Sequence, residues 1–338
     1  MLLPTPTSAR SPSWASDVLA ERIMSAAKGL HQPVLLEASL ELLRIGPGAV
    51  VIDATLGPGG HAEALLERVG PEGRVIGIDR DPEAVARART RLAEFGSRFT
   101  ACQGDHRDIA ALMQDSGVVI VDGILADLGI SSAQLDDPAR GFSFSSEGPL
   151  DMRLDPASGD PTAADLIRGL GERELRDLIA TWGEDRLAGR IARTIVRARE
   201  DRPIRTTREL ASLVERAAGP AARRFRIHPA TRTFQALRIA VNREIGYLPA
   251  FVAGAVSLLR RGGRLAVISF HSLEDRAIKR AMHDLADRCV CPPGLPVCGC
   301  GRENIVRIVT SRPVVPSAAE VASNPRARSA KLRAVERL

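Results

Sequence analysis

Residues 50–64 constrain the fold of this chain more than any other segment, and they read Val-Val-Ile-Asp-Ala-Thr-Leu-Gly-Pro-Gly-Gly-His-Ala-Glu-Ala. A β-branched run ends at Asp53, a turn with three glycines follows, and the next residues favour a helix. A second apolar run, residues 74–78, ends at Asp79. Strand, glycine turn, helix and a second strand with a terminal acid predict a βαβ unit that binds a nucleotide.

The spacing of the glycines indicates which nucleotide. A pyrophosphate site uses Gly-x-Gly-x-x-Gly, whereas here the pattern is Asp-x-x-x-Gly-x-Gly-Gly, with Asp53 upstream and His61 at the helix start. A carboxylate at this place would repel a pyrophosphate but suits a ligand with an amine and a sulfonium cation, which predicts S-adenosylmethionine. Asp79 would then accept hydrogen bonds from both ribose hydroxyls. A glycine-rich loop of an unrelated α/β protein is the alternative for this segment alone.

Composition sets wider limits. With 338 residues, 44% of them hydrophobic and 26% charged, the chain is long enough for two globular units. No apolar stretch approaches the roughly 20 residues of a membrane helix. The formal net charge is +6, but only three of the 47 basic residues are lysines, which indicates a codon bias. Net basicity is therefore a weak indication of a nucleic-acid partner.

The chain is expected to divide into four parts. Residues 1–30, rich in proline and serine, have no apolar core of a secretory signal and predict a disordered extension. Residues 31–135 and 249–338 are expected to form two halves of one nucleotide-binding domain, and residues 136–248 a mainly helical insert between them. Because no disulfide framework is apparent either, we expect a cytosolic protein.

Two further strands are predicted in the first half. Residues 99–103 end near Asp105 and His106, and residues 118–126 lead into Asp127. In an open parallel sheet, ligands bind at the carboxyl ends of the strands. Asp53, Asp79, Asp105 and Asp127 are therefore expected to converge on one crevice, with His106 near the adenine ring.

The insert predicts helices over residues 163–170, 172–182, 187–200 and 207–218. Arginines alternate with apolar residues there, which fits either a solvated face or a surface that follows phosphates. These arginines are Arg186, Arg190, Arg193, Arg197 and Arg199.

A helix predicted over Thr231–Tyr247 places Gln235, Arg238 and Asn242 on one face. Their side chains are expected to bond either nucleobase edges or the neighbouring domain. Aromatic residues make up only 3% of the chain, and we expect Phe142, Phe144 and Phe270 to be packing residues rather than platforms for a base.

The sheet is predicted to resume at residues 263–269, with Phe270 and His271 facing the crevice. Ser272 and Asp275 have the spacing of a capping box, which predicts that Ser272 caps the next helix. The basic segment 324–333 suggests either phosphate contacts or a solvated tail.

Four cysteines lie close together in a loop rich in proline and glycine. Paired thiolates could bind zinc tetrahedrally, but each pair here is Cys-x-Cys, a tighter spacing than structural zinc normally uses. We therefore favour reduced cysteines on a loop, and no metal site, for Cys289, Cys291, Cys298 and Cys300.

Taken together, these motifs closely resemble those of the bacterial small-subunit ribosomal RNA cytosine-N4 methyltransferases. The resemblance extends from His31 to the C-terminus. It is carried by 31–36 (His-Gln-Pro-Val-Leu-Leu), 53–61, 77–81 (Gly-Ile-Asp-Arg-Asp), 122–136, 140–144 (Arg-Gly-Phe-Ser-Phe), 150–153 (Leu-Asp-Met-Arg), 232–238, 268–276 and 324–330. The family implies a Rossmann-like methyltransferase sheet interrupted by a helical insert. It also implies methylation of one cytosine N4 near the decoding centre, with S-adenosylmethionine as donor.

The resemblance also assigns site residues. It implies that the donor is bound by Gly59, Gly60, His61, Asp79, His106, Asp127 and Gln134. Family members can carry an aromatic residue at the position of His106, so the role of this side chain is the least specific of the set. Asp127 is in addition the expected acceptor for the cytosine amine.

The sequence leaves other classes of function as alternatives. These are a methyltransferase acting on another nucleic-acid amine, a nicotinamide-dependent oxidoreductase and a non-catalytic ribosome-assembly factor. The glycine turn of this chain lacks the third glycine that a nicotinamide-dependent oxidoreductase would need. A non-catalytic assembly factor would not need an acid at the end of each of four strands. The expected partner is small-subunit ribosomal RNA or the small ribosomal subunit, with a homodimer also compatible and no membrane involved.

Overall fold

The computed structural model describes residues 33–338 apart from 221–226, 288–290, 292–298 and 302. Residues 34–338 form one compact unit. The predictions for the extension 1–30 and for Cys289 and Cys298 concern residues outside the described ones. Within the described part, no helix is long and apolar enough to cross a membrane.

Seven strands of the described residues form one sheet in the order β3-β2-β1-β4-β5-β7-β6. The first five in this order are parallel to one another, while β7 runs antiparallel to both β5 and β6. The strands are β1 (Val50–Asp53), β2 (Arg74–Asp79), β3 (Phe99–Gln103), β4 (Val121–Asp127), β5 (Leu259–Ser269), β6 (Val306–Ile308) and β7 (Lys331–Arg337).

Helices cover both faces of the sheet because its strands are apolar on both sides. In β1, for example, Val51 packs on one face and Ile52 on the other. One face is covered by α2 (Leu36–Leu43), α3 (Gly60–Val69) and α4 (Pro82–Arg91). The other is covered by α5 (Ile109–Asp115), α12 (Leu248–Leu258) and α13 (Ser272–Ala286), and α14 (Ala318–Ser323) precedes β7.

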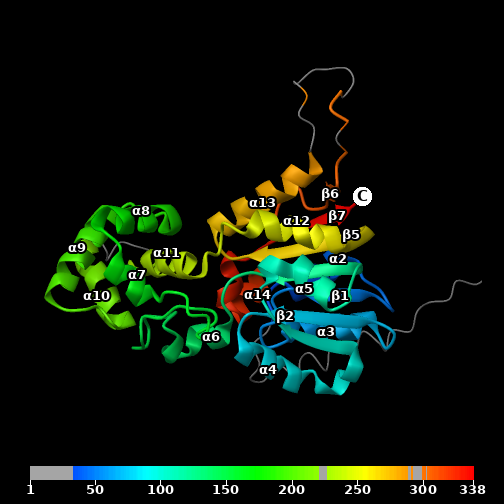
Figure 1. The fold of residues 1–338 in the computed structure, drawn as a ribbon, viewed down its shortest axis with the longest axis horizontal. Helices are drawn as coiled ribbons and strands as arrows, with labels where there is room; N and C mark the ends of the chain where they lie inside the picture. The colour runs from blue at the N-terminus through cyan, green and yellow to red at the C-terminus, as the bar shows by residue number, and fades with distance from the viewer. Residues whose placement is uncertain (1–32, 221–226, 288–290, 292–298, 302) are drawn as a thin grey trace, which may run out of the picture. The chain divides into compact units, whose positions relative to one another are not determined.

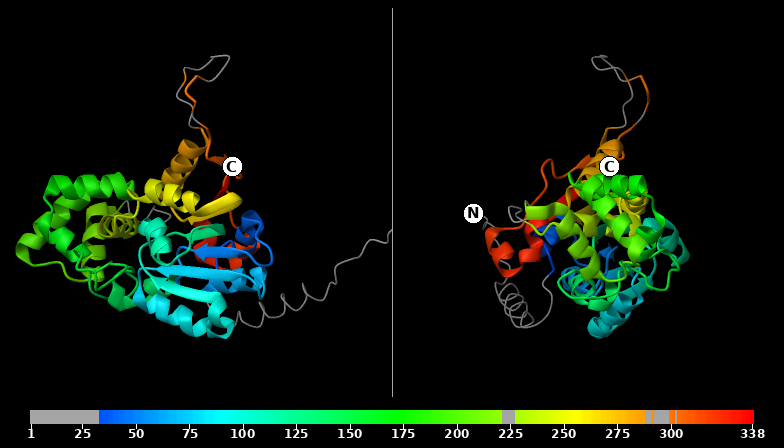
Figure 2. Two further views of the ribbon diagram at one scale, coloured as in Figure 1. Left: turned by 45° about the vertical axis from the view of Figure 1, so that its right-hand side comes forward. Right: turned by 90° about the vertical axis from the view of Figure 1, so that its left-hand side faces the viewer.

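Most of the chain between β4 and α12 forms a helical insert with its own core, which lies beside the sheet (Figures 1 and 2). Its helices are α7 (Ala163–Gly169), α8 (Glu172–Gly183), α9 (Ala188–Asp201), α10 (Thr207–Ala218) and α11 (Ala230–Asn242), and the short helix α6 (Ser132–Asp136) leads into it. The predicted fold class, a parallel α/β sheet interrupted by a helical insert, is confirmed.

Two local predictions are wrong. The helix predicted over Thr231–Tyr247 ends at Asn242, because Arg243 adopts a left-handed conformation with φ of 52°. The cap of α13 is His271, whose ring accepts a hydrogen bond from the backbone N–H of Glu274. Ser272 is the first helical residue, and its hydroxyl donates to Glu184 in the insert instead.

The basic C-terminal segment is part of the sheet rather than a solvated tail. Its last residues begin β7, where Lys331 and Arg333 pair with Asp275 of α13. Arg326, just before this strand, pairs with Asp136 at the end of α6. These basic groups therefore connect the C-terminus to the fold, and the alternative of a solvated tail is excluded for them.

Candidate active site at the carboxyl edge of the sheet

The turn after β1 depends on glycine at two positions. Gly57 and Gly59 have φ of 50° and 87°, in the left-handed region that other residues rarely adopt. Gly59 is the N-cap of α3, and a Cβ there would come within 3.1 Å of the Leu92 side chain. Gly60 begins the helix. The predicted strand, glycine turn and helix are thus all present.

Asp79, at the end of β2, lies directly across from this turn. Its Oδ2 accepts the backbone N–H of Gly57 at 2.7 Å, and its Oδ1 accepts the N–H of Asp81 at 2.9 Å. Burial raises its pKa to about 6 in spite of these hydrogen bonds, which lower it. Each carboxylate oxygen keeps a second lone pair, so Asp79 can still accept hydrogen bonds from a ligand.

Asp53 and Asp127 end the neighbouring strands β1 and β4, and within the described residues neither has a salt bridge to lysine or arginine. Asp53 Oδ1 accepts the N–H of Thr55, whereas Asp53 Oδ2 and Asp127 Oδ1 are buried and have no hydrogen-bond partner in the described part of the chain. Burial raises the pKa of Asp53 to about 7. Burial, with the nearby charges of Asp53 and Glu274, also raises the pKa of Asp127 well above its ordinary value. The fold thus holds two acids in an electrostatically unfavourable place.

His61 connects this acidic pair to the start of the described chain. Its Nε2 lies 3.1 Å from the carbonyl oxygen of Val34, and its Nδ1 lies 3.8 Å from Asp127 Oδ2. The ring is buried in the first turn of α3. The side chain of His61 therefore lies beside Asp127, at the end of β4.

At the end of β3 the acid has cations of its own. Asp105 Oδ2 lies 3.0 Å from Arg80 Nε and accepts Arg107 Nε at 2.7 Å. Burial alone would raise the pKa of Asp105, but the hydrogen bonds from Arg107 lower it below its usual range. Asp105 lies at the predicted edge, but its charge is already balanced within the protein.

His106, just beyond the end of β3, packs against α12 and the residue that precedes it. Its Nε2 lies 2.8 Å from the hydroxyl of Tyr247, and its ring packs edge-on against Tyr247 and Phe251. Burial lowers the pKa of His106 to about 4, so the ring is neutral. In this arrangement the side chain belongs to the packing with α12.

Gln134 lies beside the turn that follows β2. Its side-chain oxygen accepts the N–H of Ser131, closing a capping box, and its Nε2 donates to Asp81 Oδ2 at 2.9 Å. Arg140 donates to the same oxygen at 2.8 Å. Burial raises the pKa of Asp81, but the hydrogen bonds from Arg140 and Gln134 outweigh it and lower the pKa overall. Asp81, which sequence reasoning did not single out, thus connects the turn after β2 to the insert.

The insert is held to this point by a continuous set of hydrogen bonds. Arg140 Nη2 donates to the carbonyl oxygens of Arg153 and Leu154 at 3.1 and 2.7 Å. Asn242 of α11 in turn accepts the N–H of Leu154 and donates to the carbonyl of Met152. We call the group Asp81, Gln134 and Arg140 the Asp81 clamp.

The predicted amide face of α11 bonds groups of the protein itself. Gln235 donates to the carbonyl oxygen of Trp182, and Arg238 pairs with Glu244. The partners of Gln235, Arg238 and Asn242 all lie within the insert segment. The bonds that the structure shows are therefore neither to nucleobase edges nor to the neighbouring domain, the two predicted alternatives. Of the aromatic candidates, Phe142 is buried in the core of the insert and Phe144 packs against it, as expected of packing residues.

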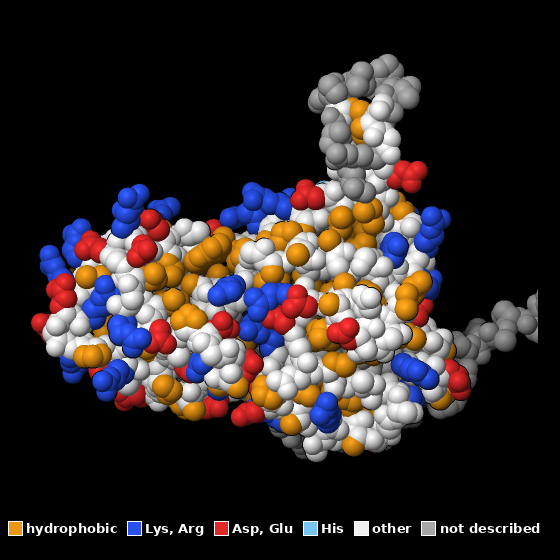
Figure 3. Space-filling model, in the orientation of Figure 1, with side chains coloured by type: hydrophobic (Ala, Val, Ile, Leu, Met, Phe, Trp, Pro, Cys, Tyr) orange, Lys and Arg blue, Asp and Glu red, His pale blue; other side chains and the backbone are white. Residues whose placement is uncertain are grey.

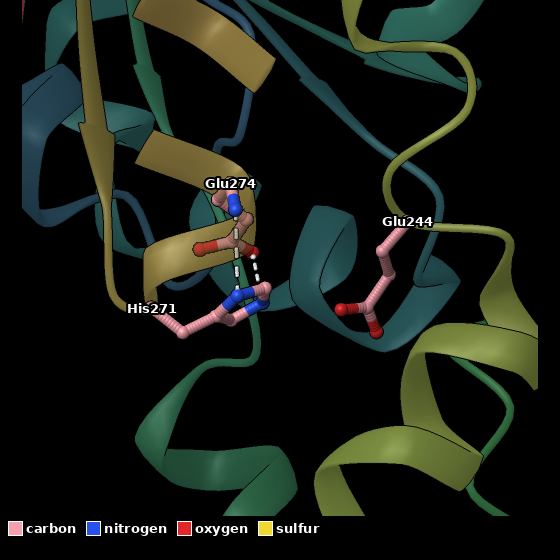
Figure 4. A group of neighbouring side chains, drawn as sticks. All are labelled: Glu244, His271 and Glu274. Atoms are coloured by element: carbon pink, nitrogen blue, oxygen red, sulfur yellow. Dashed lines mark hydrogen bonds and ion pairs between the residues drawn. The ribbon is translucent and has the colours of Figure 1, made fainter. Parts of the chain in front are cut away.

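A second charged cluster lies where the insert meets the end of β5. Figure 4 shows the carboxylate of Glu244 pointing toward the ring of His271 and the carboxylate of Glu274. Donor atoms of the three residues lie within 4.8 Å of one another, a spacing that could suit a metal ion. However, Arg238 donates to both oxygens of Glu244, and His271 Nε2 lies 3.2 Å from Glu274 Oε1. We interpret the cluster as an ion-pair network, because Arg238 already supplies a cation.

The residues at the strand ends fit the donor that the sequence predicts. S-adenosylmethionine carries a sulfonium and an ammonium group. The buried oxygens of Asp53 and Asp127 that lack a partner in the described chain are acceptors that a cationic ligand would satisfy. The positive φ of Gly59 allows the chain to turn sharply beside them. The donor set at this edge is therefore compatible with such a ligand.

Comparisons with known proteins agree with the resemblance seen in the sequence. The family model described as the MraW methylase family matches residues 28–338. A protein of Thermomicrobium roseum named ribosomal RNA small subunit methyltransferase H is 56% identical over 308 residues, covering 91% of this chain and 94% of that protein. Proteins of the same name from Trichlorobacter lovleyi and Geobacter sulfurreducens are each 51% identical, covering 91% of this chain and 98% and 99% of their own. The resemblance is confirmed.

Proposed function

This chain belongs to the MraW methylase family, and from that premise we propose that it methylates the exocyclic N4 amine of a cytosine in small-subunit ribosomal RNA. The donor is S-adenosylmethionine. The observation that supports this most directly is the pair of buried carboxylate oxygens of Asp53 and Asp127, at adjacent strand ends, without partners among the described residues. Buried carboxylates with strongly raised pKa values are typical of functional sites.

Within this proposal, the donor is bound by the residues that the sequence singled out. Gly59, Gly60 and His61 shape the turn, and Asp79 accepts hydrogen bonds from the ribose. Gln134 acts through Asp81 rather than by direct contact. His106 forms part of the wall behind the adenine region, because its Nε2 is already bonded to Tyr247. When bound, the donor supplies a methyl group on a sulfonium, a strong electrophile.

Asp127 is proposed to serve the acceptor amine. The lone pair of a cytosine amine is delocalised into the ring, so the amine is a poor nucleophile. A carboxylate that accepts its hydrogen bond favours a pyramidal nitrogen and stabilises the positive charge that develops there. The raised pKa of Asp127 makes it a suitable acceptor for the proton that this nitrogen releases. The remaining task is alignment of the reacting atoms.

The insert, residues 136–248, is proposed to bind the surrounding RNA, while residues 31–135 and 249–338 form the methyltransferase domain. The target base must leave its stack to reach Asp127. We propose the small ribosomal subunit as partner and the cytosol as the place of action. A homodimer is compatible with this proposal, and sedimentation with and without RNA measures it.

The decisive experiment is methyl transfer from labelled S-adenosylmethionine to small ribosomal subunits from cells lacking this protein. Nucleosides are then resolved by mass spectrometry. Label in N4-methylcytidine is the expected result. Label in another nucleoside would replace the cytosine by a different nucleic-acid amine. Donor binding without transfer to subunits or to free RNA would favour an assembly factor, and absence of donor binding would refute the assignment of the site.

A further inference from the structure

An exposed row of arginines follows α9 on the outer side of the insert. Arg186 lies just before the helix, and Arg190, Arg193 and Arg197 lie within it. Residues three or four apart share one face of a helix, so these four form a continuous row about 16 Å long. All four side chains are exposed. We call them the α9 row.

The α9 row cannot turn inward. The opposite face of the helix carries Ile191 and Ile195, which are buried in the core of the insert. Arg199, which the sequence grouped with the row, points inward: it donates to the backbone carbonyls of Ile167 and Leu170, near the end of α7. The helix therefore separates a structural arginine from arginines directed to the solvent.

Few acids balance the α9 row. Within the described residues, its one ion pair joins Arg193 to Glu172 at 3.3 Å, and both side chains are largely exposed. Such an exposed pair contributes little and is easily exchanged for another anion. In the same described part of the chain, Arg186, Arg190 and Arg197 have no ion pair. The flanking residues Gly189 and Thr194 are short, so the guanidinium groups are accessible.

The neighbouring helices show a different arrangement. The exposed Arg168 of α7 pairs with Asp165 at 2.6 Å. In α8, Arg173 and Arg176 both lie within ion-pair distance of Asp177, at 3.9 and 2.6 Å. Each of these three exposed arginines thus has an ion pair within its own helix, two of them with the same aspartate, whereas only one arginine of the α9 row has an ion pair among the described residues. Figure 3 shows several basic side chains, with acidic ones among them, along the left-hand edge, where α9 lies in Figure 1.

We propose that the α9 row binds the sugar–phosphate backbone of the substrate RNA. This inference rests on the proposed function, and it places a second contact region on the insert, apart from the methyl-transfer site. Guanidinium groups without acid partners release counterions from the RNA when they neutralise phosphates, which is favourable at low salt. Because backbone contacts carry no sequence information, the row anchors the RNA and leaves base selection to the crevice.

The test compares two triple variants. R190Q/R193Q/R197Q removes the row, and R168Q/R173Q/R176Q removes the same number of exposed charges from α7 and α8. Both arginine and glutamine favour helices, so the fold is retained. The dissociation constant for small-subunit ribosomal RNA is measured between about 50 and 200 mM salt, the range over which phosphate contacts weaken strongly.

For the row variant, we expect the slope of log affinity against log salt to fall by about 0.7–0.9 for each phosphate that the row no longer neutralises. KM for RNA should rise, while kcat at saturating RNA stays unchanged. The control should keep the slope of the unmodified protein. R190K/R193K/R197K should restore it, because lysine also neutralises phosphates.

A row variant with an unchanged slope, or a control whose slope falls as much, would refute this inference while the enzyme still methylates its RNA. If the unmodified protein methylates no RNA, the proposed function itself fails, and the inference fails with it.

Discussion

The acids at the carboxyl edge of the sheet fall into two groups, which differ in whether an arginine or lysine of the described chain pairs with them. At the ends of β1, β2 and β4, the acids Asp53, Asp79 and Asp127 lie without arginine or lysine partners in the described chain, and burial raises their pKa values. At the end of β3 and after β2, Asp105 and Asp81 are paired with arginines, and their pKa values are lowered. We call these the unpaired and the paired acids.

This difference indicates a division of labour. The paired acids hold the chain together, because their charge is balanced inside the protein. The unpaired acids carry an electrostatic cost when ionised, which a proton or a bound cation would relieve. Acids of one residue type at one edge of the sheet can therefore be sorted into structural and ligand-binding groups by their partners alone.

The largest effect is expected from breaking a paired acid. Arg140→Met leaves Asp81 buried without its cation, which should lower the free energy of unfolding by about 3–5 kcal/mol. Urea unfolding measures this. Asp81→Asn keeps an oxygen to cap α4 but removes the charge, so the double variant should be less destabilised than Arg140→Met alone. Strict additivity of the two changes would contradict the pairing.

Among the unpaired acids, Asp127 should matter most for turnover. Asp127→Asn should lower the single-turnover rate of methyl transfer by about 10²–10³-fold, because a charged acceptor of the amine is removed. Asp108→Asn, which changes an exposed acid near the same edge, serves as the control. Full turnover with unchanged donor affinity in Asp127→Asn would exclude the proposed role.

Asp79 should control donor binding and its dependence on pH. Its pKa is about 6, and only the ionised carboxylate offers both oxygens as acceptors to the ribose. The donor affinity should therefore fall by up to tenfold for each pH unit below about 6. Asp79→Asn should weaken binding by about 10–100-fold at pH 8, and binding should lose this part of its pH dependence. Calorimetric titration at several pH values measures both; a pH profile identical to that of the unmodified protein would contradict the assignment.

The thermal stability of a variant at Asp53 should show how much an unpaired acid destabilises the folded protein. Its folded-state pKa of about 7 exceeds the ordinary value of 3.8, so the folded protein binds the proton more tightly. The stability that this group contributes is lost as pH rises from about 4 to 7. Asp53→Asn should therefore raise the Tm of the ligand-free protein by a few degrees, at about 2–4 °C per kcal/mol, at pH 8 and hardly at all near pH 4. A lower Tm at pH 8 would show that the charge is not costly.

Much of the fold was predictable, because it follows from local patterns. The strand ends at Asp53, Asp79 and Asp127 were each marked by an apolar run followed by an acid. The glycine turn was marked by residues that tolerate a positive φ. Helices α7 to α10 followed from apolar periodicity and start within one residue of the prediction.

The rest depended on contacts between distant residues. The end of α11 at Arg243 has no glycine to announce it, and the turn is accompanied by the pairing of Glu244 with Arg238. The role of Asp81 required Arg140, which lies 59 residues away. The ring of His106 is hydrogen-bonded to the hydroxyl of Tyr247, which lies 141 residues away along the chain. No pattern along the chain encodes such pairs.

The Asp81 clamp has a consequence for anyone who wishes to exchange inserts between relatives. The clamp contributes one residue from the β2 turn and two from the entrance of the insert. A graft cut at the apparent border between sheet and helices would separate a carboxylate from its guanidinium. A transplant that carries Gln134 and Arg140 along, into a host with an acid matching Asp81, keeps that charge compensated. The segment that can be exchanged as one piece is thus longer than the helices of the insert alone, because it begins before Gln134.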